Sequence, residues 1–518
     1  MILRRDFLAG LMGTAAATSL PHGLLASPQN DAAPVSEPAK NLANDPLRPQ
    51  YHLLPAANWM NDPNGPIYWN DRYHMFYQYN PNGAFWGDMH WGHAVSTDMV
   101  HWKHLPVALA PNPGGPDAEG CFTGTCVVQE GKVVVIYTGV QASAMKQATI
   151  RDANPPLRET QCLAIANDPD LTSWTRLPAP VIAELPAGIE VNGFRDPSPW
   201  KQGDWWYTVL GSGIANQGGA VLLFRSKDLR SWEFVHLLAS KNDGAPSFDP
   251  FDPWDVWECP EIFSLGGKHV LICSTGGKAY WRSGTLDPAT MRFHSEQAGI
   301  LDYGSFYAPK TQLDKAGNRI IWGWISEARP VNEHKAAGWA GMMSLPRVLT
   351  LGSDGRLRTS VAEEVNALRK SRQVLDITHD EEKNQRQIDA MRLKGCAGEI
   401  QCEVQRTSAP FTLVLAGSAA DAAPWLTLEY DPGHRGQIAI DGRRIPVALG
   451  DQESFELHFY VDGSVIETFV NRQACLTERF YYTGSAQDLR LRWTGKTSNI
   501  VSLTVWQLSP ISADRLTT

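Results

Sequence analysis

The sequence offers almost nothing that could lie in a membrane or bind zinc. Its one N-terminal apolar run, from Ala9 to Leu20, is shorter than the roughly 20 residues that a spanning helix needs, and no other segment is apolar enough to cross a bilayer. The eight cysteines have neither zinc-site spacing nor the spacing of a disulfide framework, and we expect buried free thiols at Cys121, Cys126, Cys162, Cys259 and Cys273. The sequence predicts no membrane anchor, no metal and no cofactor.

Positive charge is also scarce. Lys and Arg number 46 against 55 Asp and Glu, which gives a formal net charge of −9. A protein that binds nucleic acid or an anionic membrane surface normally has the opposite balance. We therefore expect a neutral small-molecule or polysaccharide substrate, and the sequence carries no signal for an oligomeric state.

The residues that are abundant favour β-structure. The chain has 19 Trp, 44 Gly and 35 Pro in 518 residues, a composition typical of many short strands joined by tight turns. The length indicates two to three domains. We predict an all-β protein.

The N-terminus has the pattern of an export signal. Arg4-Arg5-Asp6-Phe7-Leu8 precedes the apolar run and resembles a twin-arginine signal. We interpret residues 1–26 as this signal peptide and residues 27–46, rich in Ala, Pro, Asn and Asp, as a disordered leader. The predicted location is the bacterial periplasm or the extracellular space.

Three stretches place an acidic residue next to or near a proline, with an aromatic residue close before it. Asp62 lies in Trp59-Met60-Asn61-Asp62-Pro63-Asn64-Gly65, Asp196 in Phe194-Arg195-Asp196-Pro197, and Glu258 in Trp257-Glu258-Cys259-Pro260. Taken singly, the first is typical of a capping turn and the second of a structural salt bridge. Their recurrence indicates a shared function.

These stretches together resemble glycoside hydrolase family 32, which includes invertases, inulinases and levanases. Residues 91–93, 121–124 and 322–324 extend the resemblance, which runs from about His52 into the C-terminal region. It implies that Asp62 is the nucleophile, Glu258 the acid/base and Asp196 the transition-state stabiliser. Substrate-binding residues that it suggests are Asn61, Gln78, Trp86, Phe122, Thr123 and Arg195.

Local chemistry gives each carboxyl group an expected charge state. Turn N–H groups and amides should keep Asp62 ionised, and Arg195 next to Asp196 should keep that carboxylate anionic. Glu258 lies beside Trp257 and Cys259, where burial should favour the protonated acid.

A D-x-x-x-W repeat suggests the architecture. It occurs at Asp98–Trp102, Asp170–Trp174 and Asp228–Trp232, at separations long enough for one four-stranded propeller blade. We predict a five-bladed β-propeller at 47–359 whose inner strands start at Asp62, Thr123, Asp196, Glu258 and Tyr307. A charged, helix-prone linker at 360–384 and a C-terminal β-sandwich at 385–518 should follow, the sandwich supporting the propeller or binding carbohydrate.

The leading functional hypothesis is a retaining β-fructofuranosidase that releases terminal fructose from levan, inulin or sucrose-type substrates through a covalent fructosyl-enzyme. A fructosyltransferase on the same carboxylates and a non-catalytic sugar-binding propeller are the alternatives. Bulky Phe85, Trp86, Phe251 and Trp254 favour a narrow entrance and attack from chain ends. We interpret Phe248–Pro253 as a rigid loop, with calcium binding as the alternative.

Overall fold

The computed structural model describes residues 42–244, 256–418, 423–434, 436–447, 454–482, 488–513 and 516. The predicted signal peptide, most of the predicted leader, and Phe248–Pro253 with Phe251 and Trp254 lie outside these residues. Among the residues described, no helix is both long enough and apolar enough for a membrane span.

The fold is all-β, as predicted. Helices in the described part of the chain are short, and they comprise α3 (Val331–Ala337), α4 (Glu381–Ala390) and 3-10 turns at Met145–Gln147, Glu363–Leu368, Lys394–Cys396 and Thr497–Asn499. All eight cysteines are buried free thiols, which confirms that expectation.

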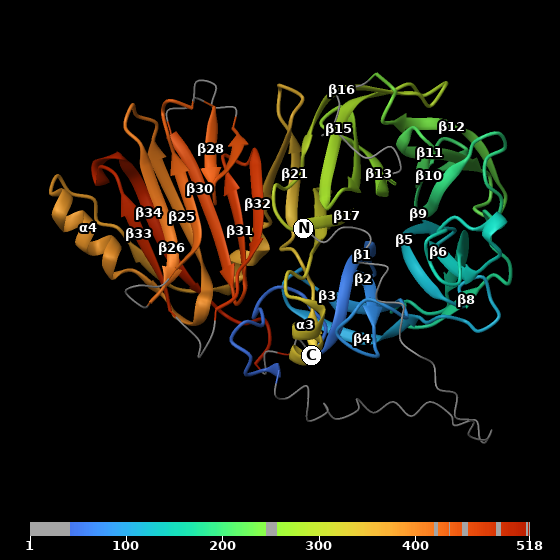
Figure 1. Cartoon of the computed structure of the whole chain (residues 1–518), viewed down its shortest axis with the longest axis horizontal. Helices are drawn as coiled ribbons and strands as arrows, with labels where there is room; N and C mark the ends of the chain where they lie inside the picture. Colours follow the sequence, from blue (N-terminus) through green and yellow to red (C-terminus); the bar gives the residue numbers. More distant parts are fainter. Residues whose placement is uncertain are drawn as a thin grey trace.

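Five sheets follow one another between residues 58 and 361 and lie together on one side of the molecule (Figure 1). The first has the order β19-β1-β2-β3-β4, with strands at Trp339–Ala340, Asn58–Trp69, Arg72–Asn80, His90–Ser96 and Trp102–Leu109. The second has the order β5-β6-β7-β8, with strands at Gly120–Gln129, Lys132–Ala142, Leu157–Ala166 and Trp174–Arg176.

The third sheet has the order β12-β11-β10-β9, with strands at Trp232–Ser240, Gly218–Ser226, Trp205–Ile214 and Val191–Gln202. The fourth has the order β13-β14-β15-β16, with strands at Glu258–Leu265, Lys268–Thr275, Lys278–Leu286 and Phe293–Ile300. The fifth has the order β17-β18-β21-β22, with strands at Phe306–Leu313, Arg319–Ile325, Arg347–Leu351 and Leu357–Val361. The short strand β20, at Met342–Met343, also pairs with β18.

The first strands of these sheets form a closed ring. β1 contacts β5, β5 contacts β9, β9 contacts β13, β13 contacts β17, and β17 returns to β1. The late strand β19 pairs in parallel with β1 and so ties the last part of this region to its beginning. Second strands such as β6 and β10 are buried over nearly their whole length, which explains their continuous runs of β-branched and aromatic residues.

The D-x-x-x-W repeat forms the turn between the third and fourth strands of three sheets. In the first and third sheets, Asp98 and Asp228 accept the backbone N–H groups of residues two and three positions later. In the second sheet the acceptor is Asp168, two residues before the expected Asp170. The repeat thus marks the outer turn, as predicted, but it misses one of the accepting carboxylates.

The C-terminal part consists of two six-stranded sheets that share one apolar core, and we call it the C-terminal sheet pair (Figure 1). One sheet is β23-β34-β25-β30-β31-β32, at Arg369–Val374, Ile500–Leu508, Ala397–Gln405, Ser454–Asp462, Val465–Val470 and Ala474–Arg479. The other is β24-β33-β26-β27-β28-β29, at Arg392–Leu393, Leu489–Thr494, Phe411–Gly417, Pro424–Tyr430, Gln437–Ile440 and Arg443–Pro446.

The segment 360–384, expected to be a linker, is more than a connection. It contains a 3-10 turn and the beginning of α4, and its strand β23 pairs antiparallel with β34 at the edge of the C-terminal sheet pair. The sequence did not predict this strand, because the residues of β23 are polar and mostly exposed and so lack the alternating apolar pattern of a half-buried strand.

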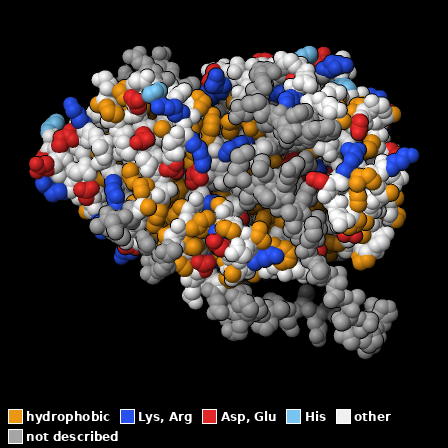
Figure 2. Space-filling model, viewed as in Figure 1, with side chains coloured by type: hydrophobic (Ala, Val, Ile, Leu, Met, Phe, Trp, Pro, Cys, Tyr) orange, Lys and Arg blue, Asp and Glu red, His pale blue; other side chains and the backbone are white. Residues whose placement is uncertain are grey.

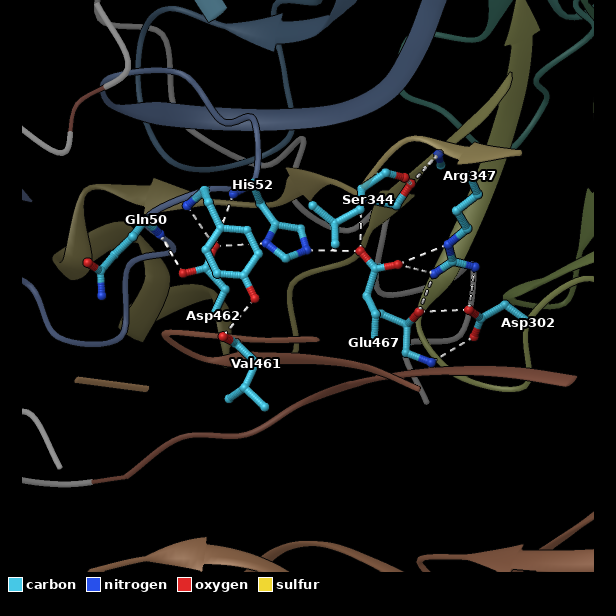
Figure 3. Close-up of polar contacts among 12 residues, drawn as sticks. Gln50, His52, Asp302, Ser344, Arg347, Val461, Asp462 and Glu467 are labelled. Carbon is cyan, nitrogen blue, oxygen red and sulfur yellow. Dashed lines mark hydrogen bonds and ion pairs between the residues drawn. The ribbon is translucent and has the colours of Figure 1, made fainter. Parts of the chain in front are cut away.

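A buried ionic network joins the two parts of the molecule (Figure 3). His52 lies between two carboxylates of the C-terminal sheet pair, 2.8 Å from Asp462 and 2.9 Å from Glu467. Arg347 from β21 donates to Glu467 and, at 2.9 Å, to Asp302. The two carboxylates hold the pKa of His52 at about 9 despite burial, so this histidine is a cation at neutral pH.

Backbone pairing reinforces the same interface. The N–H groups of Tyr303 and Ser305 donate to the carbonyl oxygens of Cys475 and Thr477 at 2.8 and 2.7 Å. A Cβ atom on Gly304 would lie 1.8 Å from the Thr477 carbonyl oxygen, so only glycine fits there. This contact immediately precedes β17.

Charges on the visible surface are mixed. On the face drawn in Figure 2, Lys and Arg side chains alternate with Asp and Glu instead of gathering into one basic stripe.

Replacing Arg347 should test how much the interface network contributes to stability. Arg347→Met leaves Asp302 and Glu467 buried without their cation, so we expect the free energy of unfolding to fall by about 3–5 kcal/mol in chemical denaturation. Arg369→Met is the matched control, because Arg369 pairs with buried Glu399 but keeps a quarter of its side chain exposed, at 25%. An Arg347 loss no larger than the Arg369 loss would contradict the prediction.

Candidate active site

Every inner strand of the ring breaks its pairing register at the residues singled out from the sequence. The breaks lie at Met60/Pro63 in β1, Cys121/Gly124 in β5, Arg195/Ser198 in β9, Glu258/Glu261 in β13 and Tyr307/Lys310 in β17. Such bulges redirect side chains and accommodate proline, which cannot donate to the ladder. The acidic-proline motifs are thus equivalent bulges in the first, third and fourth sheets.

Three of these bulges have a left-handed residue immediately before the proline. The φ angles are 64° at Asp196, 49° at Cys259 and 49° at Ala308. Conformations of this kind are costly for residues other than glycine and persist where surrounding contacts hold them. Two of the three adjoin or carry the carboxyl groups described next, Asp196 itself and Cys259 after Glu258.

Cys259 shows how closely those carboxylates converge. Its backbone N–H donates to Asp196 Oδ2 at 2.7 Å, and its thiol lies 3.5 Å from Asp62 Oδ2. Glu258 is the preceding residue. One short segment of β13 therefore brings together three carboxylates from β1, β9 and β13.

Asp62 is held by two side-chain donors. Asn61 Nδ2 donates to Oδ1 at 3.0 Å, and Thr123 Oγ1 donates to Oδ2 at 2.8 Å. Burial nevertheless raises the pKa of Asp62 above its usual value, and the nearby charge of Glu258 adds to this effect. The expectation that hydrogen bonds would dominate was wrong in direction, because desolvation outweighs them.

Asp196 is almost completely buried, with 2% of its surface exposed. Burial raises its pKa to about 7, and the charges of Glu258 and Asp62 add to this against the opposing effects of Arg195 and the Cys259 N–H. Here too the expected direction was wrong. The Arg195 guanidinium makes its hydrogen bonds to Glu159 and Glu258, while the Asp196 N–H donates to Thr138 Oγ1 at 2.9 Å.

Glu258 keeps more solvent contact than the two aspartates, with 29% of its side chain exposed. Arg195 Nη2 donates to Oε1 at 2.7 Å, and the Tyr307 hydroxyl donates to Oε2 at 2.6 Å. The burial expected from Trp257 does not occur, because the Trp257 side chain points into the core, where Gly219 leaves room for its ring.

An apolar wall adjoins the carboxylates. Trp59, Trp324, Trp86, Phe122 and Tyr307 belong to one cluster, in which Trp86 and Phe122 pack edge to face with ring centroids 6.0 Å apart. Trp86, Phe122 and Tyr307 are only partly buried, so part of each side chain remains accessible. Aromatic side chains of this kind offer flat apolar contact area.

The remaining predicted binding residues have distinct positions. Asn61 and Thr123 contact Asp62, and Arg195 contacts Glu258, as described above. Gln78 is buried, and its Nε2 donates to the Cys121 carbonyl at 2.9 Å, so this amide orients β5 beside Thr123.

Sequence reasoning missed three polar residues behind the site. Thr138 on β6 and Glu159 and Gln161 on β7 are fully buried and contact Phe194, Arg195 and Asp196. Glu159 and Gln161 are two residues apart and share one face of β7. Two polar residues on a face of β7 that otherwise carries Leu157, Leu163 and Ile165 were the available signal.

The described residues contain no group of three or more His, Cys, Asp or Glu side chains arranged to hold a metal ion. What the site offers is a set of carboxyl groups with one guanidinium, one phenol and one thiol. Such a set can supply a nucleophile, a proton donor and electrostatic stabilisation of a cation.

Comparison with known proteins gives consistent results along the chain. Residues 52–360 match the model of the glycosyl hydrolases family 32 N-terminal domain, and residues 364–507 match that of the family 32 C-terminal domain. A sucrose-6-phosphate hydrolase of Escherichia coli is 34% identical over 486 residues, covering 89% of this chain and 94% of the relative.

Two solved structures are similar over most of the fold. A variant of the Bombyx mori GH32 beta-fructofuranosidase in complex with sucrose aligns with a TM-score of 0.71 and 28% identity, covering 91% of this chain and 96% of its own. A variant of fructan 1-exohydrolase IIa from Cichorium intybus in complex with 1-kestose aligns with a TM-score of 0.72 and 25% identity, covering 90% and 98%.

The raised pKa of Asp196 predicts a pH-dependent cost in stability. Its folded-state pKa of about 7 exceeds the ordinary aspartate value of 3.8, so its stabilising contribution is complete below 3.8 and is lost as pH rises through 7. Asp196→Asn should therefore raise the melting temperature relative to wild type by a few degrees at pH 8 and little at pH 4.

Asp98→Asn is the control of opposite sign. The Asp98 carboxyl accepts several hydrogen bonds that lower its pKa despite partial burial, so this variant should lose stability at pH 8. Calorimetry across the pH range measures both variants. A uniform shift of Asp196→Asn at all pH values would show that its carboxyl is not the origin of the cost.

Proposed function

Because the chain belongs to glycoside hydrolase family 32, we propose that it is a retaining β-fructofuranosidase that releases terminal fructose from sucrose-type substrates and fructans through a covalent fructosyl-enzyme. The observation that carries the proposal is the double contact of Cys259 with Asp62 and Asp196, next to Glu258. Three carboxyl groups drawn from separate strands to one point are what a glycosidase mechanism uses.

In the first step Asp62 attacks the anomeric carbon of the fructosyl unit. Its carboxylate is aligned by Asn61 and Thr123, and its raised pKa reflects a desolvated and therefore reactive anion. Asp196, buried beside it, stabilises the positive charge that develops on the ring in the transition state. The glycosidic bond breaks as the bond to Asp62 forms.

Glu258 supplies the proton for the leaving oxygen. Arg195 donates to Oε1 and cannot accept, which favours placing the acid proton on Oε2. There the Tyr307 hydroxyl can switch from donor to acceptor until the leaving oxygen takes the proton. In the second step Glu258 takes a proton from water, which attacks the anomeric carbon and frees Asp62.

Two observations support the substrate class. The partly exposed aromatic wall suits a furanose ring, and the two structural neighbours described above are in complex with sucrose and 1-kestose. Release from chain ends is our inference from the bulky Trp86 of that wall and from Phe85, which precedes it in the sequence. Transfer of fructose to a second sugar is the alternative outcome of the same intermediate, in which a sugar hydroxyl replaces water.

We also propose that the five consecutive sheets are the blades of a five-bladed β-propeller and that the C-terminal sheet pair is a β-sandwich that supports it. The closed ring of contacts among β1, β5, β9, β13 and β17 and the equivalent bulges in these strands favour this architecture. The propeller that we propose spans 47–359, and the sandwich predicted at 385–518 begins earlier, because β23 at Arg369–Val374 is one of its strands.

The proposed location is outside the cytoplasm. The Arg4-Arg5 pair and the apolar run that follows support a twin-arginine signal in residues 1–26. Eight free buried thiols are compatible with this route, because a chain that folds before export has no need of disulfides.

A product assay tests the proposed activity. Wild-type protein incubated with sucrose, inulin and levan should give fructose as the first and dominant product from each substrate that it accepts. Asp62→Ala and Glu258→Ala should each lower kcat by at least about 10²-fold without loss of folding, whereas the exposed Asp170→Asn should not. On a substrate whose leaving group needs no proton, azide should partly restore Glu258→Ala, because it attacks the fructosyl-enzyme without help from the missing base. Oligosaccharides appearing before fructose would contradict release from chain ends, and full activity of either alanine variant would contradict the mechanism.

Export is tested separately. Changing Arg4 and Arg5 together to lysine should leave the protein in the cytoplasm, because the paired guanidinium groups are what the transport receptor reads. Immunoblots of cell fractions measure the distribution, with Lys40→Arg as a neutral control. Unchanged export would point to the general secretory route.

A further inference from the structure

We propose that Glu159 is a positioning residue of this active site, which fixes Arg195 and the turn before Asp196 and balances the guanidinium charge that faces Glu258. The inference rests on the proposed glycosidase function. It adds a residue that touches neither the substrate nor the reacting atoms and acts through Arg195.

Glu159 uses both carboxylate oxygens on the turn that carries the site. Oε1 accepts from Arg195 Nη1 at 2.7 Å, and Oε2 accepts the backbone N–H of Phe194 at 2.7 Å. None of its surface is exposed. A buried carboxylate is retained only when it is well paired, and here both pairs lie on two successive residues of β9.

Glu159 belongs to a set of contacts through which the second sheet holds this turn. Gln161 Nε2 donates to the Phe194 carbonyl, and Gln161 Oε1 accepts from the Thr138 hydroxyl, which itself receives the Asp196 N–H. The Gly193 N–H donates to the Thr149 carbonyl, and the Thr149 hydroxyl receives the Glu159 N–H. Consecutive residues 193–196 are thus each held, which fixes the left-handed conformation of Asp196.

The charges point to a second consequence. Arg195 donates through Nη1 to Glu159 and through Nη2 to Glu258, so one guanidinium lies between two glutamates. Its charge is permanent. Because Glu159 neutralises part of that charge, Arg195 orients Glu258 without holding it fully ionised, and Glu258 remains able to carry the proton.

Other charged and titratable groups also face Glu258 in the described residues. Arg195 and Asp196 come from β9, Asp62 from β1, and Tyr307 from β17. Cys259 follows it on β13, and Lys310 on β17 acts on the thiol of Cys259. Of these groups, only Arg195 is hydrogen-bonded to Glu159, so a change at Glu159 reaches Glu258 through that guanidinium.

Glu159→Gln removes the negative charge and keeps the size of the side chain. Arg195 then directs its charge to Glu258 alone, which favours the carboxylate and lowers the pKa of the acid/base. The alkaline limb of the kcat/KM profile should move about 1 unit toward lower pH. We also expect kcat to fall about tenfold from looser alignment, with KM changed by less than about twofold.

Two variants separate charge from shape and from general stability. Glu159→Asp keeps the charge but is one methylene too short to reach both partners, so kcat should fall while the alkaline limb stays where it is. If Glu159→Gln does not fold, Glu159→Asp still tests whether the position of this carboxylate affects kcat. Glu399→Gln removes an equally buried carboxylate, paired with Arg369 and His458 away from the site, and should leave both kcat and the pH profile unchanged.

A second readout does not depend on substrate. In protein labelled with ¹³C at glutamate carboxyls, the Glu258 resonance, identified by its absence in Glu258→Gln, should titrate at lower pH in Glu159→Gln than in wild type. If wild type releases no fructose, the proposed function is wrong and this titration still tests the role of Glu159. An unshifted titration, or a variant that loses melting temperature but keeps its pH profile, would overturn the inference.

Discussion

The active site depends on a guanidinium that holds carboxylates together in a space from which water is largely removed. This environment raises the pKa values of Asp62 and Asp196, because burial and repulsion from the neighbouring carboxylates both disfavour their anions. The positive charge of Arg195 offsets part of this repulsion. The pKa of Arg195 itself is raised well above its usual value by the charges of Glu159, Glu258 and Asp196, although burial acts in the opposite direction. The arrangement is stable only if the surrounding backbone cannot relax.

Rigidity of that backbone comes from two places. The ring of inner strands closes on itself through β17 and β1, and β19 ties its end to its start. The C-terminal sheet pair holds residues 303–305 by backbone hydrogen bonds to β32, directly before β17 begins at Phe306. Because Tyr307 on β17 donates to Glu258, this interface fixes one partner of the acid/base from a distance. A supporting role for the sheet pair follows from these contacts.

The sequence allowed the all-β class, the carboxylates and the outer turns to be predicted, because each has a local cause. Proline at a bulge, an Asp that caps a turn and runs of β-branched residues are visible in a few neighbouring letters. Burial was not visible in this way, so the pKa directions of Asp62 and Asp196 were wrong. Glu159 was missed because its partners lie 35 and 36 residues away, and β23 was missed because an exposed edge strand has no apolar alternation.

The error about Arg195 has a more specific origin. Adjacent residues of a strand point to opposite sides, so a neighbour in sequence is seldom a partner in space. At this bulge the left-handed Asp196 turns the backbone again, and the guanidinium reaches Glu159 and Glu258 while Asp196 faces the Cys259 N–H. The motif is recognisable in sequence because of the bulge, and the bulge is also what gives the guanidinium its hydrogen-bond partners on other strands. Arg195 still lowers the pKa of Asp196 through its charge, but burial outweighs that effect. The effect of burial and the hydrogen-bond pairing therefore have to be taken from the strands that the bulge brings together.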